Sequence, residues 1–128
     1  MEFRAFKRED LNQIIRLCEA EGWQSYTADP ERTCRALSGS GVITVVAIED
    51  GKVLGFAQLL TDSAIRAYLA NMVVDSSRRR SGIGRRLVEE VFARCNAVYI
   101  DLFSTDGAEA FYETFPHRRF PGYRLRTN

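Results

Sequence analysis

The chain has 128 residues, 45% of them hydrophobic and 27% charged, with a formal net charge of +1. This length suits one hydrophobic core, so we expect a single domain over residues 1–128, and the composition excludes a disordered or fibrous protein. Near-neutral charge also excludes an overall field that would draw the whole molecule to nucleic acid or to an anionic membrane.

The first third of the chain predicts one strand and two helices. Residues 2–6 alternate polar and apolar side chains, which favours a short strand. Apolar residues at three- and four-residue spacing predict a helix over residues 9–21. Asp29 and Pro30 are typical of the N-cap and first position of a second helix, which should stop in the turn at residues 38–41.

The middle of the chain predicts three consecutive strands. Residues 42–48 are rich in β-branched side chains, and Asp50-Gly51 is a hairpin signal before a strand at residues 53–60. A turn at residues 61–63 leads to a third strand over residues 64–74. Strands in this order form an antiparallel meander.

The last third predicts helix, strand, helix and strand. The helix starts after Gly82 and runs to Arg94, and the other elements cover residues 97–103, 105–115 and 123–126. The strand at 97–103 follows a helix, so it should lie parallel to its predecessor. The fold class is therefore α/β of the α+β type, with a mixed, mostly antiparallel sheet.

The cysteines indicate a reducing environment. Cys18, Cys34 and Cys95 lack C-x-x-C spacing and a histidine pair, so we expect free thiols and no metal site. The sequence has no signal-peptide pattern, and no run approaches the roughly 18 apolar residues that span a bilayer. We expect a cytoplasmic protein with no membrane partner.

The segment Ser81-Gly82-Ile83-Gly84 opens the predicted helix that ends at Arg94. Glycines let the backbone approach a ligand, and first-turn N–H groups lack partners within a helix. The helix dipole favours an anion there, and five arginines flank the segment: Arg78, Arg79, Arg80, Arg85 and Arg86. The pattern predicts a ligand with several phosphates, but it is neither a P-loop nor a Rossmann fingerprint, since Leu87 stands where the third Rossmann glycine belongs.

Arg79-x-x-Gly82-x-Gly84 resembles the Arg/Gln-x-x-Gly-x-Gly/Ala signature of GNAT superfamily N-acetyltransferases. Residues 105–112 resemble the later Asn-x-x-Ala-x-x-Phe/Leu-Tyr helix of that family, with Thr105 in the place of Asn. The resemblance covers essentially the whole chain and implies a GNAT-like sheet with helices on both faces. It also implies transfer of acetyl from acetyl-CoA, as cosubstrate, to a primary amine of a small molecule or peptide, by direct attack in a ternary complex.

The resemblance implies roles for particular residues. Backbone N–H groups of Met72, Val73 and Val74 would stabilise the thioester oxygen if their strand splays from its neighbour, and Tyr112 would protonate the leaving thiolate. Trp23 and Tyr26 would line the acceptor pocket. The remaining expected contacts to the coenzyme are Arg79, Arg80, Ser81, Gly82, Ile83, Gly84, Arg85, Thr105, Ala108 and Phe111.

The general base stays open. Many relatives carry a glutamate on the strand before the loop, whereas this chain has Tyr68-Leu69-Ala70-Asn71. Asn71 and Tyr68 ordering a water is one hypothesis, and Glu21 or Asp62 reaching the site is another. The only histidine, His117, is a third, because imidazole titrates near neutral pH.

Two other functions compete with catalysis. The missing carboxylate motivates a non-catalytic acyl-CoA-binding regulatory module. Arginines in the loop and near the carboxyl end motivate a nucleic-acid-binding domain, but near-neutral charge and the lack of a recognition motif argue against it. The expected partner is an amine or peptide substrate, with no nucleic acid, and the protein is a monomer or homodimer.

Overall fold

The computed structural model describes residues 1–127. Five strands form one sheet in the order β1-β2-β3-β4-β5. The first four pair antiparallel with their neighbours, and β5 pairs parallel with β4, which confirms the predicted mixed sheet. Their bounds are β1 (Glu2–Ala5), β2 (Val42–Glu49), β3 (Lys52–Thr61), β4 (Arg66–Val74) and β5 (Tyr99–Asp101).

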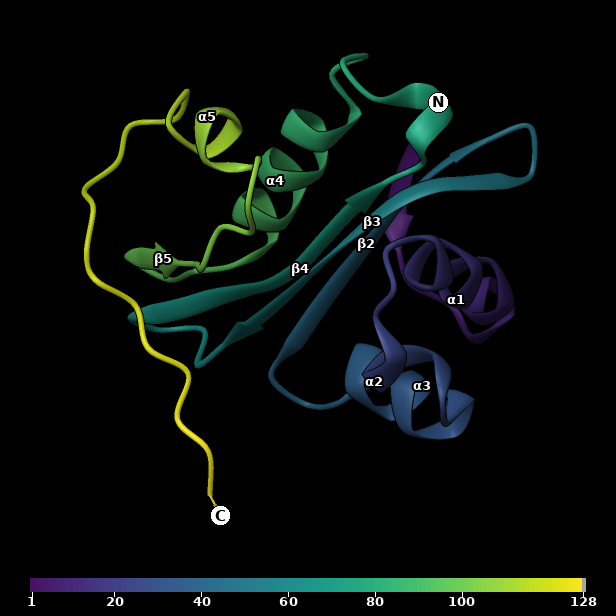
Figure 1. Cartoon of the computed structure of the whole chain (residues 1–128), viewed down its shortest axis with the longest axis horizontal. Helices are drawn as coiled ribbons and strands as arrows, with labels where there is room; N and C mark the ends of the chain where they lie inside the picture. Colours follow the sequence, from purple (N-terminus) through teal and green to yellow (C-terminus); the bar gives the residue numbers. More distant parts are fainter. Residues whose placement is uncertain (128) are drawn as a thin grey trace.

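Helices cover both faces of this sheet (Figure 1). One face carries α1 (Leu11–Ala20), α2 (Gln24–Thr27) and α3 (Pro30–Ser38), and the other carries α4 (Ile83–Arg94) and α5 (Glu109–Tyr112). Two 3-10 turns, η1 (Arg8–Asp10) and η2 (Ser76–Arg78), precede α1 and α4. Across residues 1–127 no helix is long and apolar enough to cross a membrane.

The sheet separates two apolar cores. Ile14, Leu37 and Phe56 are fully or nearly fully buried in the core under α1 and α3. Leu59 and Leu87 belong to the core under α4. Burial of apolar surface stabilises by about 25 cal/mol per Å², so both cores contribute to holding β4 between the two helical layers.

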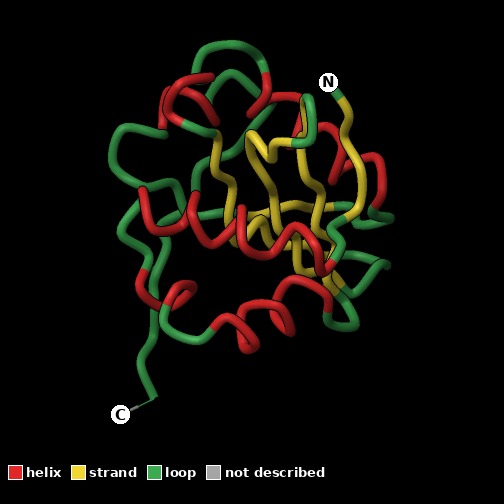
Figure 2. Tube along the Cα trace, turned by 90° about the vertical axis from the view of Figure 1, so that its right-hand side faces the viewer, coloured by secondary structure: helices red, strands yellow, loops and turns green. Residues whose placement is uncertain are grey.

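The carboxyl end departs from the sequence expectation. The predicted strand at residues 123–126 is wrong, since residues 116–127 form a loop that leads away from the body (Figure 2). Arg119 instead pairs with Glu109 and Glu113, which holds this segment beside α5. Alternating side chains indicate a strand only where a neighbouring strand supplies backbone partners.

Two helices are shorter than predicted. Residues 105–108 form a turn in which the Ala108 N–H donates to the Thr105 carbonyl, so α5 starts only at Glu109. A proline follows Phe115 and cannot continue a helix. At the other end of the chain, Asp10 accepts hydrogen bonds from Arg4 and from the Lys7 N–H, and the tight turn that results delays α1 until Leu11.

A β-bulge shapes β4. Gln58 of β3 lies opposite Asn71 and Leu59 lies opposite Leu69, so Ala70 is an extra residue on β4. The bulge puts Leu69 and Met72 on the same face, because both pack against the α4 core. Asn71 therefore faces the α1–α3 side of the sheet.

Candidate active site

The loop between β4 and α4 has an unusual backbone. Gly82 is the N-cap of α4 with φ +87°, and Arg80 adopts φ +63° two residues earlier. A left-handed conformation costs a residue other than glycine about 1 kcal/mol or more, and such strain concentrates at functional loops. The first bond of the helix runs from the Arg86 N–H to the Gly82 carbonyl at 3.1 Å, so the N–H groups ahead of it lack a helical partner.

Gly84, in the first turn of α4, lets two side chains approach the helix. A Cβ atom on Gly84 would lie 3.4 Å from Met72 Cε and 3.5 Å from Phe111 Cζ. Met72 comes from the end of β4 and Phe111 from α5, so the glycine joins three segments at one point. Three residues predicted to contact the coenzyme therefore lie together.

Most of the arginines near the loop pair with carboxylates. Arg79 donates to Glu21 at 3.0 Å and to the Val74 carbonyl at 3.3 Å. The other pairs are Arg78 with Glu49, Arg85 with Glu89 and Arg86 with Glu90. Within residues 1–127, Arg80 has no ion pair. The five arginines do flank the helix start as expected, but four of them also pair with nearby carboxylates.

Arg85 ties the start of α4 to the segment after α5. Its guanidinium lies 4.2 Å from the ring centroid of Phe115 and donates to Thr114 Oγ1 at 3.0 Å. A cation over an aromatic face is attracted by the ring quadrupole. This contact orients α5, and with it Phe111 and Tyr112, against α4.

The strands beside the loop separate as the motif requires. β5 pairs only with Arg66, Ala67 and Tyr68 at the start of β4. The rest of β4, from the bulge to Val74, has no partner strand on that side among the described residues. This splay leaves the N–H groups of Met72 and Val74 facing the gap. The Val73 N–H faces β3 instead, because N–H groups alternate along a strand and that of Asp75 already donates to Leu54 of β3.

Tyr112 and Tyr68 both line one large hollow. It has a volume of about 1200 Å³ and lies among β5, α5, the end of α4 and the loop at 116–124. Burial raises the pKa of the Tyr112 hydroxyl, so this group keeps its proton at neutral pH. No described residue forms a hydrogen bond with it, and Tyr68 stacks edge-on with Phe103 at 5.7 Å.

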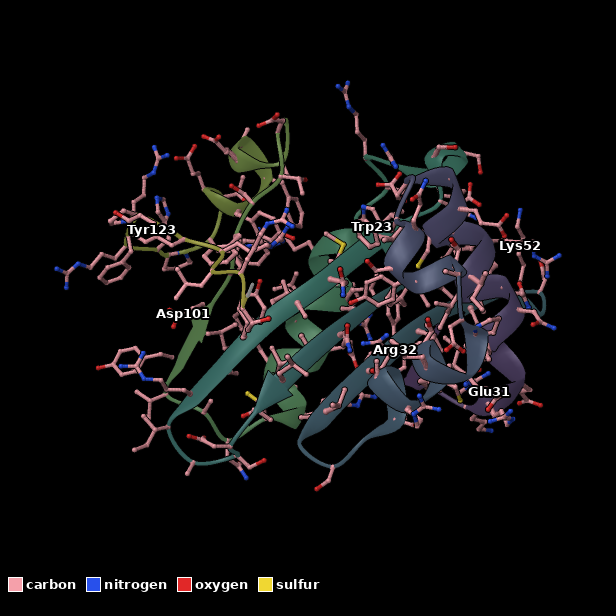
Figure 3. All side chains as sticks on the ribbon, turned by 60° about the horizontal axis from the view of Figure 1, so that its bottom comes forward. Trp23, Glu31, Arg32, Lys52, Asp101 and Tyr123 are labelled. Atoms are coloured by element: carbon pink, nitrogen blue, oxygen red, sulfur yellow. The ribbon has the colours of Figure 1, made fainter. Side chains whose placement is uncertain are left out.

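On the opposite face of β4, the predicted acceptor residues lie together. Trp23 lies on the α1–α3 side of the sheet, as Figure 3 shows, and its ring centroid is 6.0 Å from that of Tyr26. The Tyr26 hydroxyl contacts both Asn71 and Gln58. Burial raises the pKa of Tyr26 against the opposing effect of the hydrogen bond from Asn71.

Gln58 is the site residue that sequence reasoning missed. It lies in the middle of β3 with 3% of its surface exposed, and its Oε1 is 2.7 Å from Asn71 Nδ2. A lone amide inside the apolar run of residues 53–60 was the available signal, because buried polar groups need partners.

The three alternative bases are placed differently. Asp62 Oδ1 accepts the N–H groups of Ala64, Ile65 and Arg66, and these bonds, that of Ile65 first, lower the Asp62 pKa. Asp62 is thus a turn-capping residue. Glu21 pairs with Arg79, and His117 lies exposed with its Nδ1 2.8 Å from the Phe115 carbonyl.

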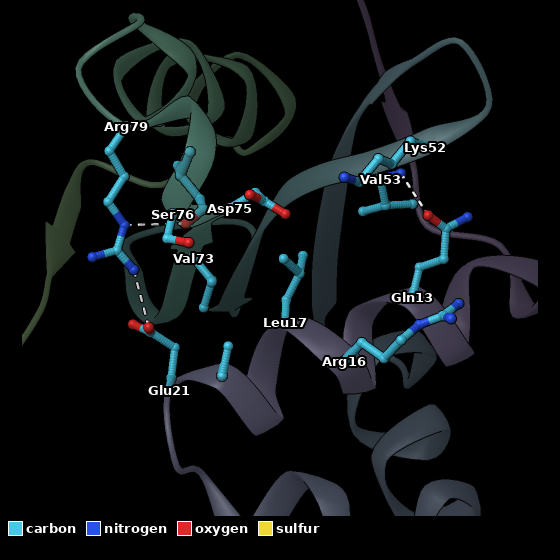
Figure 4. Close-up of a pocket in the computed structure, with 12 residues that line it drawn as sticks. Gln13, Arg16, Leu17, Glu21, Lys52, Val53, Val73, Asp75, Ser76 and Arg79 are labelled. Atoms are coloured by element: carbon cyan, nitrogen blue, oxygen red, sulfur yellow. Dashed lines mark hydrogen bonds and ion pairs between the residues drawn. The ribbon is translucent and has the colours of Figure 1, made fainter.

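A smaller hollow of about 340 Å³ lies between α1 and the ends of β3 and β4 (Figure 4). The Arg79–Glu21 ion pair spans one side, and Gln13 accepts the Val53 N–H at 2.8 Å on the other. These contacts hold α1 to the β4–α4 loop. Within residues 1–127 no group of three or more His, Cys, Asp and Glu side chains is placed to hold a metal ion.

Solved structures share this fold. A GNAT-family acetyltransferase from Streptococcus pneumoniae superposes with a TM-score of 0.79 and 20% identity over 99% of this chain and 98% of that one. The values for an acetyltransferase from Trypanosoma brucei are 0.71 and 23% over 99% and 98%. The aminoglycoside N-acetyltransferase AAC(6')-Iy, solved with CoA, gives 0.72 and 19% over 98% and 99%.

At these identities the structural likeness establishes the fold alone. Comparison with curated proteins gives no match. The model of the Acetyltransferase (GNAT) domain, however, matches residues 40–115. This match runs from the turn before β2, through the glycine loop, to Phe115. With more than half of its length matched and its sheet, splay and loop in place, the chain belongs to the GNAT acetyltransferase family.

Proposed function

We propose that the chain moves an acetyl group from acetyl-CoA to a primary amine of a small molecule or peptide, with both bound at once. The observation that carries the proposal is the strained, glycine-opened start of α4 beside the gap between β4 and β5. Unpaired N–H groups and a helix dipole suit a pyrophosphate there. Acetyl-CoA supplies the activated acetyl thioester.

The residues present fit this cosubstrate. Met72 and Phe111 pack against Gly84 and would supply apolar walls for an extended ligand beside the first turn of α4. Arg80 supplies an unpaired cation next to it. We propose contacts from these residues and from Val73, Val74, Arg79, Ser81, Gly82, Ile83, Arg85, Thr105 and Ala108.

In the proposed reaction, groups on both sides of the gap between β4 and β5 take part. The amine nitrogen forms a bond to the thioester carbonyl carbon, the carbon–sulfur bond breaks, and the nitrogen loses one proton. Backbone N–H groups of Met72 and Val74, on the edge of β4 that faces the gap, donate to the carbonyl oxygen as it gains negative charge. Tyr112 gives its proton to the departing sulfur and regains, through water, the one proton that the amine nitrogen loses.

The acceptor side is assigned to four residues. Trp23 and Tyr26 bind the body of the amine, and aromatic rings suit an apolar or cationic group. Asn71 and Tyr68 order the water that carries the proton away. We place the enzyme in the cytoplasm, because its three cysteines are free thiols. We propose a monomer or a homodimer.

Calorimetry and a turnover screen test the proposal together. The wild-type chain is titrated with acetyl-CoA, and thiol release is then followed with a panel of primary amines and peptides. We expect one binding site and release of thiol that depends on the amine. Absence of binding overturns the assignment, and binding without turnover of any amine points to the acyl-CoA-binding regulatory module.

A further inference from the structure

Three polar side chains from three elements close a hydrogen-bonded network under β4. Asn71 of β4 donates from Nδ2 to Gln58 Oε1 of β3 at 2.7 Å, and it also donates to the Tyr26 hydroxyl of α2. The Tyr26 hydroxyl in turn donates to Gln58 Oε1, with 3.2 Å between the oxygens. Gln58 and Asn71 are paired across the two strands next to the bulge.

A hydrogen bond between Gln58 and Ala36 fixes which group donates and which accepts throughout this network. Gln58 Nε2 donates to the carbonyl oxygen of Ala36 in α3 at 2.9 Å. A carbonyl only accepts, so the Gln58 nitrogen must face α3 and its oxygen must face β4. That oxygen also only accepts, and Asn71 therefore has to present its NH2 group to it.

Asn71 Oδ1 consequently points away from the network. No N–H or O–H of residues 1–127 donates to it. It is not a buried orphan either, because the described residues contain no buried side-chain oxygen without a partner. The oxygen is an open hydrogen-bond acceptor on β4, between the bulge and Met72.

We propose that Gln58 is a positioning residue which fixes the Asn71 carboxamide so that Oδ1 accepts a hydrogen bond from the N–H of the acceptor amine. The inference rests on the proposed acetyl transfer and adds a specificity element to its acceptor side. The amide oxygen has two lone pairs, so the second one still accepts from the water that Asn71 and Tyr68 order. An amide that is free to flip presents its NH2 group part of the time and then repels the amine N–H. Fixing the oxygen outward removes this unproductive state.

Gln58→Met tests the idea against Thr44→Val as the matched control. Thr44 is also buried, at 5% exposure, and its hydroxyl donates at 2.7 Å to the carbonyl of Leu37 in α3, the helix that Gln58 also contacts. Both variants therefore lose one buried bond to α3, but only Gln58→Met releases Asn71. We expect kcat/KM for the amine to fall about tenfold in Gln58→Met alone, with the Kd for acetyl-CoA within about twofold of wild type in both.

A conservative variant adds a second readout. Gln58→Glu loses the bond to the Ala36 carbonyl, as Gln58→Met does, but keeps oxygen acceptors facing Asn71 Nδ2. At equal concentrations of folded protein it should therefore retain kcat/KM for the amine within about threefold of wild type. Equal losses in Gln58→Met and Thr44→Val, or in Gln58→Met and Gln58→Glu, overturn the proposal. If Gln58→Met does not fold, Asn71→Asp replaces it as the test, because a carboxylate cannot donate a hydrogen bond to Gln58. An Asn71→Asp enzyme that is as active as the wild type overturns the proposal.

An NMR measurement separates this proposal from the proposed function. The side-chain NH2 signals of Asn71 should be protected from solvent exchange in the wild type and in Thr44→Val, and should lose that protection in Gln58→Met. Unprotected signals in the wild type overturn the positioning role even if the enzyme is active. Protected signals in a protein that acetylates no amine instead overturn the proposed acetyl transfer.

Discussion

The two faces of β4 present different chemistry to the gap beside β5. Toward α4, the groups are backbone N–H groups, a methionine and a phenylalanine, gathered around Gly84. Toward α2 and α3, they are three side-chain amide and hydroxyl groups joined to one another. The first face relies largely on backbone groups, which do not depend on side-chain identity, whereas the second is built from side chains and can change with the sequence.

The largest effect should come from removing the acid on the α4 side. Tyr112→Phe deletes the hydroxyl that we assign to the leaving thiolate, so kcat should fall about 100-fold while the Kd for acetyl-CoA stays unchanged. Burial raises the Tyr112 pKa, so the wild type should keep this proton donor throughout a neutral to mildly alkaline pH profile.

Tyr99→Phe is the matched control for Tyr112→Phe. Tyr99 lines the same hollow but is 56% exposed, beside the guanidinium of Arg66. Steady-state kinetics of the two variants at equal protein stability make the comparison. A Tyr112→Phe enzyme with wild-type kcat would remove Tyr112 from the reaction.

The second-largest effect should come from Gly84, where Met72 and Phe111 pack closely against the helix. Gly84→Val puts branched methyl groups against Met72 and Phe111, which costs about 2 kcal/mol of overpacking. Displacing the first turn of α4 relieves this strain but misplaces its N–H groups, so acetyl-CoA should bind up to about 30-fold more weakly. Gly84→Ala adds only a Cβ at ordinary contact distance and should bind nearly as the wild type does. Calorimetry decides, and equal affinities for the two variants would contradict the packing argument.

The two faces also differ in how far the sequence predicts them. The glycine loop and its helix are contiguous, so local spacing predicts them, and the hairpin signal at Asp50-Gly51 likewise predicts the meander. Gln58 and Tyr26 lie 32 positions apart, and only the packing of α2 on the sheet brings them together. The bulge at Ala70 depends on the register between β3 and β4, which the residues of one strand do not reveal.

The acceptor face should also respond to alkaline pH. Burial raises the pKa of Cys18, in α1 on this side of the sheet, from 9.0 to about 11, and the nearby Glu21 carboxylate adds to the effect. As the pH rises, the unfolded chain therefore loses the Cys18 proton before the folded chain does. Between about pH 9 and pH 11 the folded chain holds more protons than the unfolded chain. The free energy of unfolding should be constant below about pH 9 and should fall by on the order of 2 kcal/mol by pH 11.

Chemical denaturation between pH 7 and 11 measures this loss. Cys18→Ala lowers stability at every pH by leaving a small cavity, but it removes the thiol and should flatten the slope above pH 9. The remaining slope reports the raised pKa values of Tyr26 and Tyr112. A Cys18→Ala profile as steep as that of the wild type would show that another group controls alkaline unfolding.

The smallest effect separates backbone strain from ligand binding. Gly82 and Gly51 both have strongly positive φ, +87° and +76°, and an added Cβ meets no atom within 4 Å at either position. Alanine at either site should therefore lower the free energy of unfolding by a similar amount, about 1 kcal/mol. Only Gly82→Ala also shifts the N–H groups that we assign to the pyrophosphate, so only this variant should weaken acetyl-CoA binding, by about fivefold. Equal acetyl-CoA affinities for Gly82→Ala and Gly51→Ala would mean that the backbone at Gly82 is needed for folding but not for binding. The phosphate contacts would then have to come from side chains such as Arg80.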